Sequence, residues 1–230
     1  MGNNLITILL PVYNDEKYLG FCLKSIQEQT YRKFICLVAF NGTTDKSKEV
    51  FKQVVGEDGR FVMIDYGMDF GKSKTLNKLL HRVKTKRVCL MDGDDIWHPE
   101  KLRFQIKTKG DPDVIGTLTA YIDSENRLGP VIPLKEHSED IKNFNLKGMN
   151  QIINSSSLIK TQCLREVGGW DPEVEGLEDF DVWVKLSLLD KEFYNIQVPL
   201  VYHRVHGESN FNSRPLKYTP SDIVKRNTLK

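Results

Sequence analysis

The sequence is poor in cysteine and has no long apolar segment. None of its four cysteines (Cys22, Cys36, Cys89 and Cys163) forms a C-x-x-C pair, so a zinc site is not indicated. Each lies in an apolar stretch, which predicts buried thiols and a reducing compartment. No run approaches the roughly 20 apolar residues that a membrane span needs. The N-terminal stretch 1–5 also lacks the basic and apolar regions of a signal peptide.

Net charge is likewise small. The 230 residues include 33 Lys and Arg against 31 Asp and Glu, which leaves a formal charge of +2. This balance gives no reason to expect nucleic acid or an anionic membrane as the main partner. The length suits a single domain with one sizeable core.

Short apolar runs alternate with helical patterns in the first half of the chain. The runs that predict strands are 5–10, 34–40, 61–66 and 87–91. Apolar residues at helical spacing lie between them, and Asn14 or Asp15 is suited to cap the first helix. This alternation predicts a mainly parallel sheet covered on both faces, a Rossmann-like three-layer α/β/α sandwich.

The second half follows a different pattern. Strands are expected at 114–122, 128–132, 157–159 and 193–203, and a largely buried helix at 178–189. The polar stretch 135–150 is expected to be irregular, and the tail after Ser209 to be loosely held. We therefore expect one domain, 1–230, with a nucleotide-sugar-binding half (1–110), an acceptor-binding half (111–210) and a polar tail (211–230).

Three carboxylates follow the fourth predicted strand at once: Asp92, Asp94 and Asp95. They repel one another unless a positive charge joins them. Ligands of an open parallel sheet bind beyond the carboxyl ends of its strands. Segments 11–14, 40–45 and 92–95 should therefore line one crevice. Carboxylate oxygens suit Mg²⁺ or Mn²⁺, ions that usually also bind substrate phosphates, so we expect a cation that holds a diphosphate.

Other readings of this acidic segment are less complete. A solvated Asp-Gly turn is a plain alternative, because such turns often follow strands. An EF-hand loop needs Asp at alternate positions and a distal Glu, which are absent. A phosphatase of the aspartyl-phosphate type would carry its Asp-x-Asp-Gly-Thr motif after the first strand, whereas here Asp94 follows the fourth.

Several motifs recur along residues 5 to about 210 in one particular order. They are Pro11-Val-Tyr13-Asn14, Phe40-Asn41-Gly-Thr-Thr-Asp45, Thr75-Leu-Asn77, Asp92-Gly-Asp94-Asp95, Val167-Gly-Gly-Trp-Asp171, Glu178-Asp179-Phe-Asp-Val-Trp183 and Tyr202-His-Arg204-Val-His206-Gly-Glu-Ser209. In this order they resemble the family-2 glycosyltransferases with the A-type, nucleotide-diphospho-sugar transferase fold. No motif is decisive alone, and the shared order carries the resemblance.

The resemblance implies that a sugar moves from a nucleotide diphosphate donor to an acceptor hydroxyl, with inversion. It implies a divalent ion, Mn²⁺ or Mg²⁺, at Asp94, with Asp92 near the donor ribose or the metal and His206 as a further ligand. A single displacement needs one general base, and the family pattern assigns this role to Asp179, with Glu178 as the rival. Position at a helix start favours ionised Asp179, although Glu178 and Asp179 are also ordinary capping residues.

The resemblance also assigns the donor-binding residues. Pro11 and Tyr13 are expected to cradle the base, Lys72 to lie near the base or phosphates, and Arg204 to close over the diphosphate. Asn41 stands where the family has a base-recognising Asp, and an amide accepts a hydrogen bond without charge. A UDP-sugar is the favoured donor, while guanine, thymine and cytosine nucleotides stay open.

The expected acceptor is a glycan, a lipid-linked sugar or a protein glycan, chosen by segment 121–176. The chain is expected to be cytoplasmic and to meet any lipid-linked acceptor at a membrane surface; no signal for an oligomeric state is present.

Simpler interpretations stay open for several residues. Lys72 suits a solvated helix start. Arg204 and His206 suit an ordinary polar loop. Trp97, Trp170 and Trp183 suit the core or the acceptor side.

Two other classes of protein fit the sequence less well. A sugar-nucleotide nucleotidyltransferase has a glycine-rich first loop with Arg and Lys, whereas loop 13–17 here is acidic and lacks glycine. A non-catalytic nucleotide-sugar-binding module does not need Asp92, Asp94 and Asp179 together.

Overall fold

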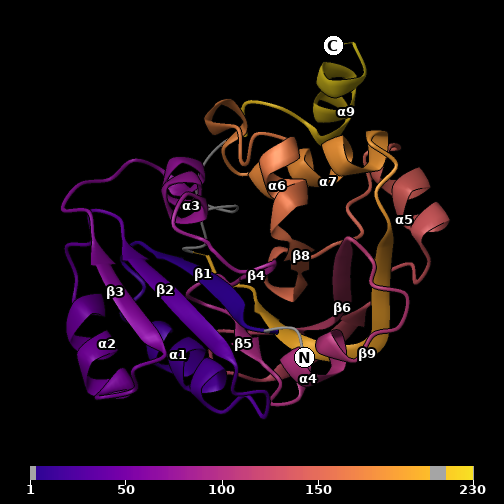
Figure 1. Ribbon diagram of the computed structural model, residues 1–230. Helices are drawn as coiled ribbons and strands as arrows, with labels where there is room; N and C mark the ends of the chain where they lie inside the picture. The colour runs from indigo at the N-terminus through magenta and orange to yellow at the C-terminus, as the bar shows by residue number, and fades with distance from the viewer. Residues whose placement is uncertain (1–3, 208–215, 230) are drawn as a thin grey trace.

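The first half of the chain forms the parallel part of one sheet. In the computed structural model, which describes residues 4–207 and 216–229, four parallel strands pair in the order β3-β2-β1-β4. They are β1 (Ile6–Val12), β2 (Phe34–Phe40), β3 (Phe61–Asp65) and β4 (Arg87–Leu90). The helices between them are α1 (Leu19–Gln27), α2 (Ser47–Val55) and α3 (Lys72–Leu80). The predicted strand–helix alternation is confirmed (Figure 1).

The second half extends this sheet with mixed pairing. β8 lies antiparallel between β4 and β6, and β6 runs parallel to β9. The added strands are β5 (Ile96–Trp97), β6 (Val114–Ile122), β7 (Leu128–Ile132), β8 (Leu158–Lys160) and β9 (Phe193–Arg204). The helical segments are α4 (Lys101–Ile106), α5 (Ser138–Asn145), η1 (Asn154–Ser156), α6 (Thr161–Glu166), η2 (Pro172–Val174), α7 (Glu178–Leu188) and α9 (Pro220–Thr228).

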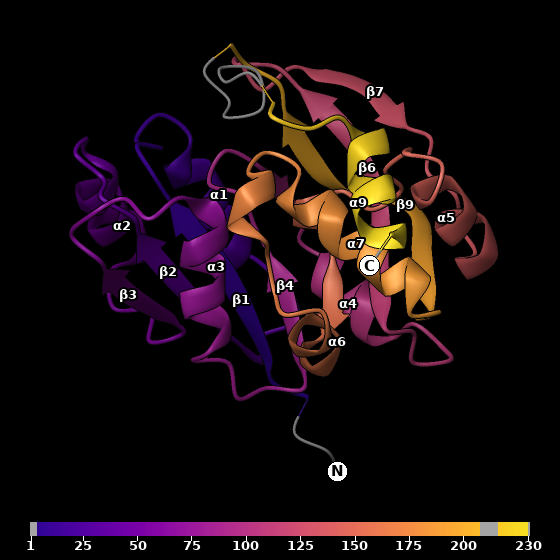
Figure 2. The ribbon, with the colours of Figure 1, turned by 90° about the horizontal axis from the view of Figure 1, so that it is seen from above.

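Each face of the sheet is covered by its own apolar core. Successive strand side chains point to opposite faces, so Ile8 of β1 packs with α1 and α2, while Leu9 packs with α3, α6 and α7. Figure 2 shows α3, α6 and α7 on one side of the strands, with α9 beside α7. The three-layer expectation is confirmed.

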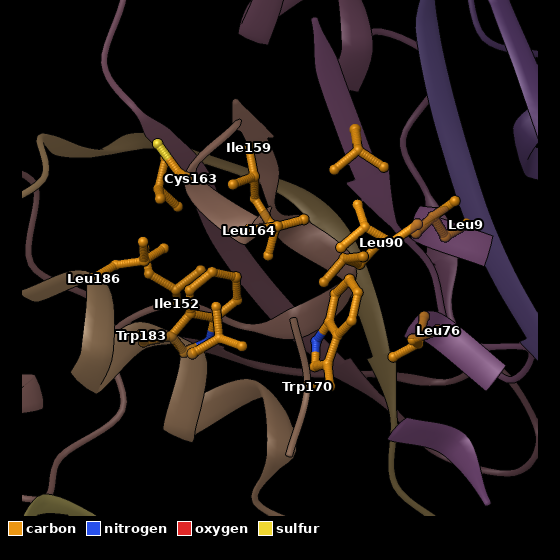
Figure 3. Packing of buried hydrophobic residues seen from close by; sticks show 14 of the residues in the cluster. Leu9, Leu76, Leu90, Ile152, Ile159, Cys163, Leu164, Trp170, Trp183 and Leu186 are labelled. Atoms are coloured by element: carbon orange, nitrogen blue, oxygen red, sulfur yellow. The ribbon is translucent and has the colours of Figure 1, made fainter. Parts of the chain in front are cut away.

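The tryptophans belong to these cores. Trp170 and Trp183 are buried among leucine and isoleucine side chains (Figure 3). Trp97 is buried in the core on the opposite face, and its indole nitrogen donates to the carbonyl of Ser155 at 2.8 Å. The four cysteine thiols are free and buried, as predicted. Among the described residues, no helix combines the length and the apolarity needed to cross a bilayer.

Two stretches differ from expectation. Segment 135–150 is not wholly irregular, because α5 forms there and buries Ile141 against the core. The described tail, 216–229, is not loosely held. Thr219 and Asp222 form a reciprocal capping box at the start of α9, whose Ile223 is fully buried. The tail's earlier part, 208–215, lies outside the described residues.

A third correction concerns the loop after β1. Neither Asn14 nor Asp15 caps α1, since the N-cap position is Tyr18 and no side chain caps it. Asn14 instead accepts a hydrogen bond from the backbone nitrogen of Thr44 at 2.9 Å. Asp15 accepts one from the nitrogen of Tyr13 at 3.1 Å. The Asn14 side chain therefore joins two loops at the carboxyl end of the sheet, and the Asp15 side chain fixes the loop that follows β1.

Candidate active site

A single cavity of about 1370 Å³ lies beyond the carboxyl ends of the parallel strands. It is lined by every site residue that the sequence predicted, namely Pro11, Tyr13, Asn41, Lys72, Asp92, Asp94, Glu178, Asp179, Arg204 and His206. These residues come from the ends of β1, β2, β4 and β9 and from the first turns of α3 and α7. Parallel strands bring their carboxyl ends to one edge, which is why residues distant in sequence meet here.

Each of the three clustered carboxylates has a basic partner of its own. Asp92 pairs with Lys72 at 2.7 Å, Asp94 with His206 at 3.0 Å, and Asp95 with His203 at 3.0 Å. Asp95 is fully buried and does not line the cavity. Because Asp95 also accepts from the backbone nitrogen of Arg204 at 2.9 Å, it ties the β4 loop to β9. Of the three, only Asp92 and Asp94 therefore line the cavity.

Lys72 joins the two sides of the cavity. Its ammonium lies 2.7 Å from Asp92 and 3.4 Å from Glu178, at the start of α7. Burial alone would lower the pKa of Lys72, but the two carboxylates outweigh burial and raise that pKa well above its usual value. Burial likewise opposes ionisation of Asp92, yet Lys72 holds the pKa of Asp92 below its usual value. The reading of Lys72 as a solvated helix-start lysine does not hold.

Asp94 carries an excess of nearby negative charge. Burial raises its pKa, and Asp95 and Asp92 add to this, although the hydrogen bond to His206 acts the other way. A fourth carboxylate, Asp15, is close by. Burial, and then Asp94, raise the pKa of Asp15 to about 8. The close approach depends on Gly93, since a Cβ there would lie 2.6 Å from Oδ2 of Asp15.

This donor set fits a divalent cation. A carboxylate oxygen of Asp94 and an imidazole nitrogen of His206 lie 3.0 Å apart, and both atoms are suited to ligate a metal. Within residues 4–207 and 216–229, no three His, Cys, Asp or Glu side chains are placed to hold an ion by themselves. A cation with few protein ligands needs oxygens from its substrate, as Mg²⁺ often does with phosphates.

Asp179 also lines the cavity, from the first turn of α7. Burial, followed by the charge of Glu178, raises its pKa to about 7, while Lys72 acts in the opposite direction. The expectation that the helix start favours ionised Asp179 is thus outweighed by burial. Glu178 is held in place, because its carboxylate accepts from the nitrogen of Gly176 at 2.6 Å. Of the two carboxylates, Glu178 is 4% exposed and Asp179 is more accessible.

Arg204 is built into the wall of the cavity. It is 1% exposed, and its guanidinium donates to the carbonyl oxygens of Asp94 and Asp123 and to the side chain of Asn126 at 2.7–2.8 Å. The guanidinium also lies over the ring of Tyr18, 4.3 Å from its centroid. These contacts fix the backbone of Asp94. Arg204 is therefore placed differently from a side chain that swings over a diphosphate, and its contact with a donor stays a prediction.

Both polar ends of the Asn41 amide are already engaged. Its nitrogen donates to Oδ1 of Asp69 at 2.6 Å, and its oxygen accepts from the backbone nitrogen of Phe70 at 2.9 Å. Asp69 is exposed and lines the cavity. In the structure the amide oxygen of Asn41 is thus engaged by the backbone, and its expected hydrogen bond to the base stays a prediction.

Four further cavity residues escaped the sequence analysis: Asp15, Tyr18, Asp69 and His203. His203 is partly exposed, and Asp95 raises its pKa to about 9. The Tyr18 hydroxyl is buried and has no hydrogen-bond partner among the described residues. Of the four, only Asp69 has a local sequence signal, because Asp69-Phe-Gly71 is typical of a turn before a helix. The other three depend on contacts between distant segments.

The sequence of this chain is similar to those of known glycosyltransferases. A family model described as glycosyl transferase family 2 matches residues 7–166. An uncharacterized glycosyltransferase of Methanocaldococcus jannaschii is 26% identical over 220 residues, which cover 93% of this chain and 75% of that protein. The putative glycosyltransferase EpsH of Bacillus subtilis is 21% identical over 221 residues, which cover 91% of this chain and 63% of EpsH.

Solved structures share the fold. The S. aureus protein TarS in complex with UDP-GlcNAc matches with a TM-score of 0.76 and 16% identity, over 92% of this chain and 61% of that one. The mannosyltransferase PcManGT of Pyrobaculum calidifontis in complex with GDP-Man and Mn²⁺ matches with a TM-score of 0.61 and 20% identity, over 84% and 54%. The chain thus spans less than two thirds of these solved chains.

The mixed α/β sheet and its carboxylate-lined cavity define a protein with the glycosyltransferase A-type fold. The chain belongs to glycosyl transferase family 2.

Proposed function

We propose that this chain is a metal-dependent, inverting glycosyltransferase that moves a sugar from a nucleotide diphosphate donor to an acceptor hydroxyl. One observation carries the proposal. One cavity is lined both by the Asp94–His206 pair and by Asp179, whose pKa is raised to about 7. The Asp94–His206 pair suits a cation and a diphosphate, and Asp179 suits proton transfer at neutral pH.

The residues divide the reaction between them. Asp94 and His206 would hold Mn²⁺ or Mg²⁺, which supplies positive charge to the leaving diphosphate. Asp92 and Lys72 orient the donor beside that pair. Asp179 takes the proton of the acceptor hydroxyl while the hydroxyl oxygen forms the new bond to the anomeric carbon. The bond from that carbon to the diphosphate breaks, and the nucleoside diphosphate leaves with the electron pair.

The second half of the chain supplies the acceptor side of the cavity. Tyr121, Asn150 and Ile153 line it, and they come from the segment 121–176 that the sequence analysis assigned to acceptor choice. An acceptor glycan, lipid-linked sugar or protein glycan therefore enters from this side. TarS and PcManGT were solved with UDP-GlcNAc and GDP-Man, which supports a nucleotide-sugar donor without choosing the base.

Calorimetry tests the donor and metal parts of the proposal. UDP, GDP, TDP and CDP are titrated into wild type, Asp94→Ala and the control Asp140→Ala, each with and without Mn²⁺. Asp140 is an exposed residue in the first turn of α5 and does not line the cavity. We expect one nucleotide to bind with Mn²⁺, Asp94→Ala to lose that binding, and Asp140→Ala to keep it. Equal binding without metal, or to Asp94→Ala, would refute metal dependence.

A further inference from the structure

The loop between β3 and α3 places Asp69 at one end of the cavity. The sheet order β3-β2-β1-β4 fixes the sequence of groups along this edge: Asp69 after β3, Asn41 after β2, Pro11 and Tyr13 at the end of β1, and Asp94 after β4. The proposed function puts the diphosphate at Asp94. Because the proposed function gives the second half of the chain to the acceptor, it leaves β1, β2 and β3 to the nucleoside, whose base then comes to the end where Asp69 lies.

Asp69 is held in a defined orientation. Its Oδ1 accepts two hydrogen bonds, from the amide nitrogen of Asn41 at 2.6 Å and from the backbone nitrogen of Gly71 at 2.8 Å. The assignment of the Asn41 amide is unambiguous, because its other end faces the N–H of Phe70, which can only donate. Gly42 makes this approach possible, since it has φ of +71° and a Cβ there would clash with the backbone of Asp69.

The second carboxylate oxygen of Asp69 is free to bind a ligand. Oδ2 has no hydrogen-bond partner among the described residues, and Asp69 is exposed to the cavity. A negative charge thus lies at position 69, in hydrogen-bond contact with Asn41, the residue that stands where the resemblance implies Asp. A hydrogen bond from a ligand to this carboxylate would be charge-assisted.

We propose that Oδ2 of Asp69 accepts the ring N–H of a uracil-type base and makes the chain select a uridine diphosphate donor, an inference that rests on the proposed function. Uracil and thymine present one ring N–H, which matches one free oxygen. Cytosine presents an unprotonated ring nitrogen at the same place, and a carboxylate repels it. Guanine presents two adjacent N–H groups that suit both oxygens of a carboxylate, but here Oδ1 already accepts two hydrogen bonds.

The test exploits the difference between a carboxylate and an amide. In Asp69→Asn the amide oxygen keeps the bonds to Asn41 and Gly71, so an NH₂ group replaces Oδ2. This group opposes the N–H of uracil and donates to the ring nitrogen of cytosine. Dissociation constants of UDP, TDP, CDP and GDP are measured by calorimetry with Mn²⁺, on wild type, Asp69→Asn and the control Asp140→Asn. Thermal melting confirms that each variant is folded.

We expect wild type to bind UDP about ten- to a hundredfold more tightly than CDP, the range for one charge-assisted hydrogen bond. Asp69→Asn should weaken UDP and TDP by a similar factor and reverse the preference between UDP and CDP. Tighter binding of GDP or CDP by wild type, or an unchanged UDP/CDP ratio in Asp69→Asn, would overturn the inference alone. If none of the four nucleotides binds wild type, the proposed function fails, and the inference fails with it.

Discussion

The pH dependence of transfer should be set by Asp179 and altered by its neighbour Glu178. Burial and the Glu178 charge raise the pKa of Asp179 from 3.8 to about 7, an interval worth about 4 kcal/mol against ionisation. A general base works only when it is ionised. Activity is therefore expected to fall about tenfold for each pH unit below 7 and to level off above it.

The perturbation is Glu178→Gln, which removes the neighbouring charge and little else. The glutamine oxygen can still accept the hydrogen bond from Gly176, and Lys72 keeps Asp92 as its partner at 2.7 Å. Burial of Asp179 is unchanged, so its pKa should fall only part of the way back toward 3.8. A fall of about one unit would raise the ionised fraction at pH 6 from about one tenth to about one half.

The assay is the release of nucleoside diphosphate from the donor, measured as kcat/KM between pH 5 and 9, because this ratio reports groups of the free enzyme. Glu139→Gln serves as the matched control, since Glu139 is an exposed glutamate in the first turn of α5. Asp179→Asn should lose about 10²- to 10⁴-fold in rate while still binding donor. If the acid limb of the pH profile of Glu178→Gln stays in place or moves to higher pH, the Glu178 charge does not raise the pKa of the base. If Glu178→Gln abolishes transfer and Asp179→Asn does not, Glu178 is the base.

Two predictions concern buried cations. Burial lowers the pKa of Lys101 from 10.5 to about 8. Between these two pH values the unfolded chain therefore binds more protons than the folded one. The contribution of Lys101 to the free energy of unfolding should rise by up to about 3 kcal/mol as pH increases through this window. The buried cysteines, whose pKa values are raised, act the opposite way in both proteins, so urea unfolding should show the gain as a rise with pH in the stability of wild type relative to Lys101→Met. A difference that stays constant with pH would refute it. Arg204→Lys should lower the free energy of unfolding by about 2–4 kcal/mol, because an ammonium cannot make all three bonds to Asp94, Asp123 and Asn126. The same change should weaken donor binding with Mn²⁺. Unchanged stability would show that Arg204 is not a wall residue.

The parallel half of the fold was predictable because its strands are buried on both faces. Such strands read as continuous apolar runs, and Phe34–Phe40 is an example. The helix at 138–145 was missed because only Ile141 and Asn145 of it are buried, which leaves little apolar pattern to read. For α9 the signal was present, since Thr219-Pro-Ser-Asp222 is a capping-box pattern with proline at the first helical position.

The candidate site was predictable where a residue follows a strand directly, and less so elsewhere. Asp92 and Asp94 follow β4, and Asn41 follows β2, so topology alone brings them together. What Asn41 does there depends on Asp69, which lies 28 positions away and is reached only through the fold. The same holds for Asp15, whose place opposite Gly93 is a contact between two loops.

Lys72 shows why the two halves of the chain work as one site. The ammonium contacts Asp92, which follows β4 in the first half, and Glu178, which begins α7 in the second. Lys72 also lowers the pKa of Asp179, against burial and Glu178. Any ligand that changes the charge at Asp92 therefore changes the electrostatic interactions of Lys72 with its neighbouring carboxylates. Through Lys72 it also changes the pKa of Asp179, the proposed base. In the proposed function, donor binding and proton transfer would therefore be coupled through this one side chain, which joins segments on both sides of residue 110.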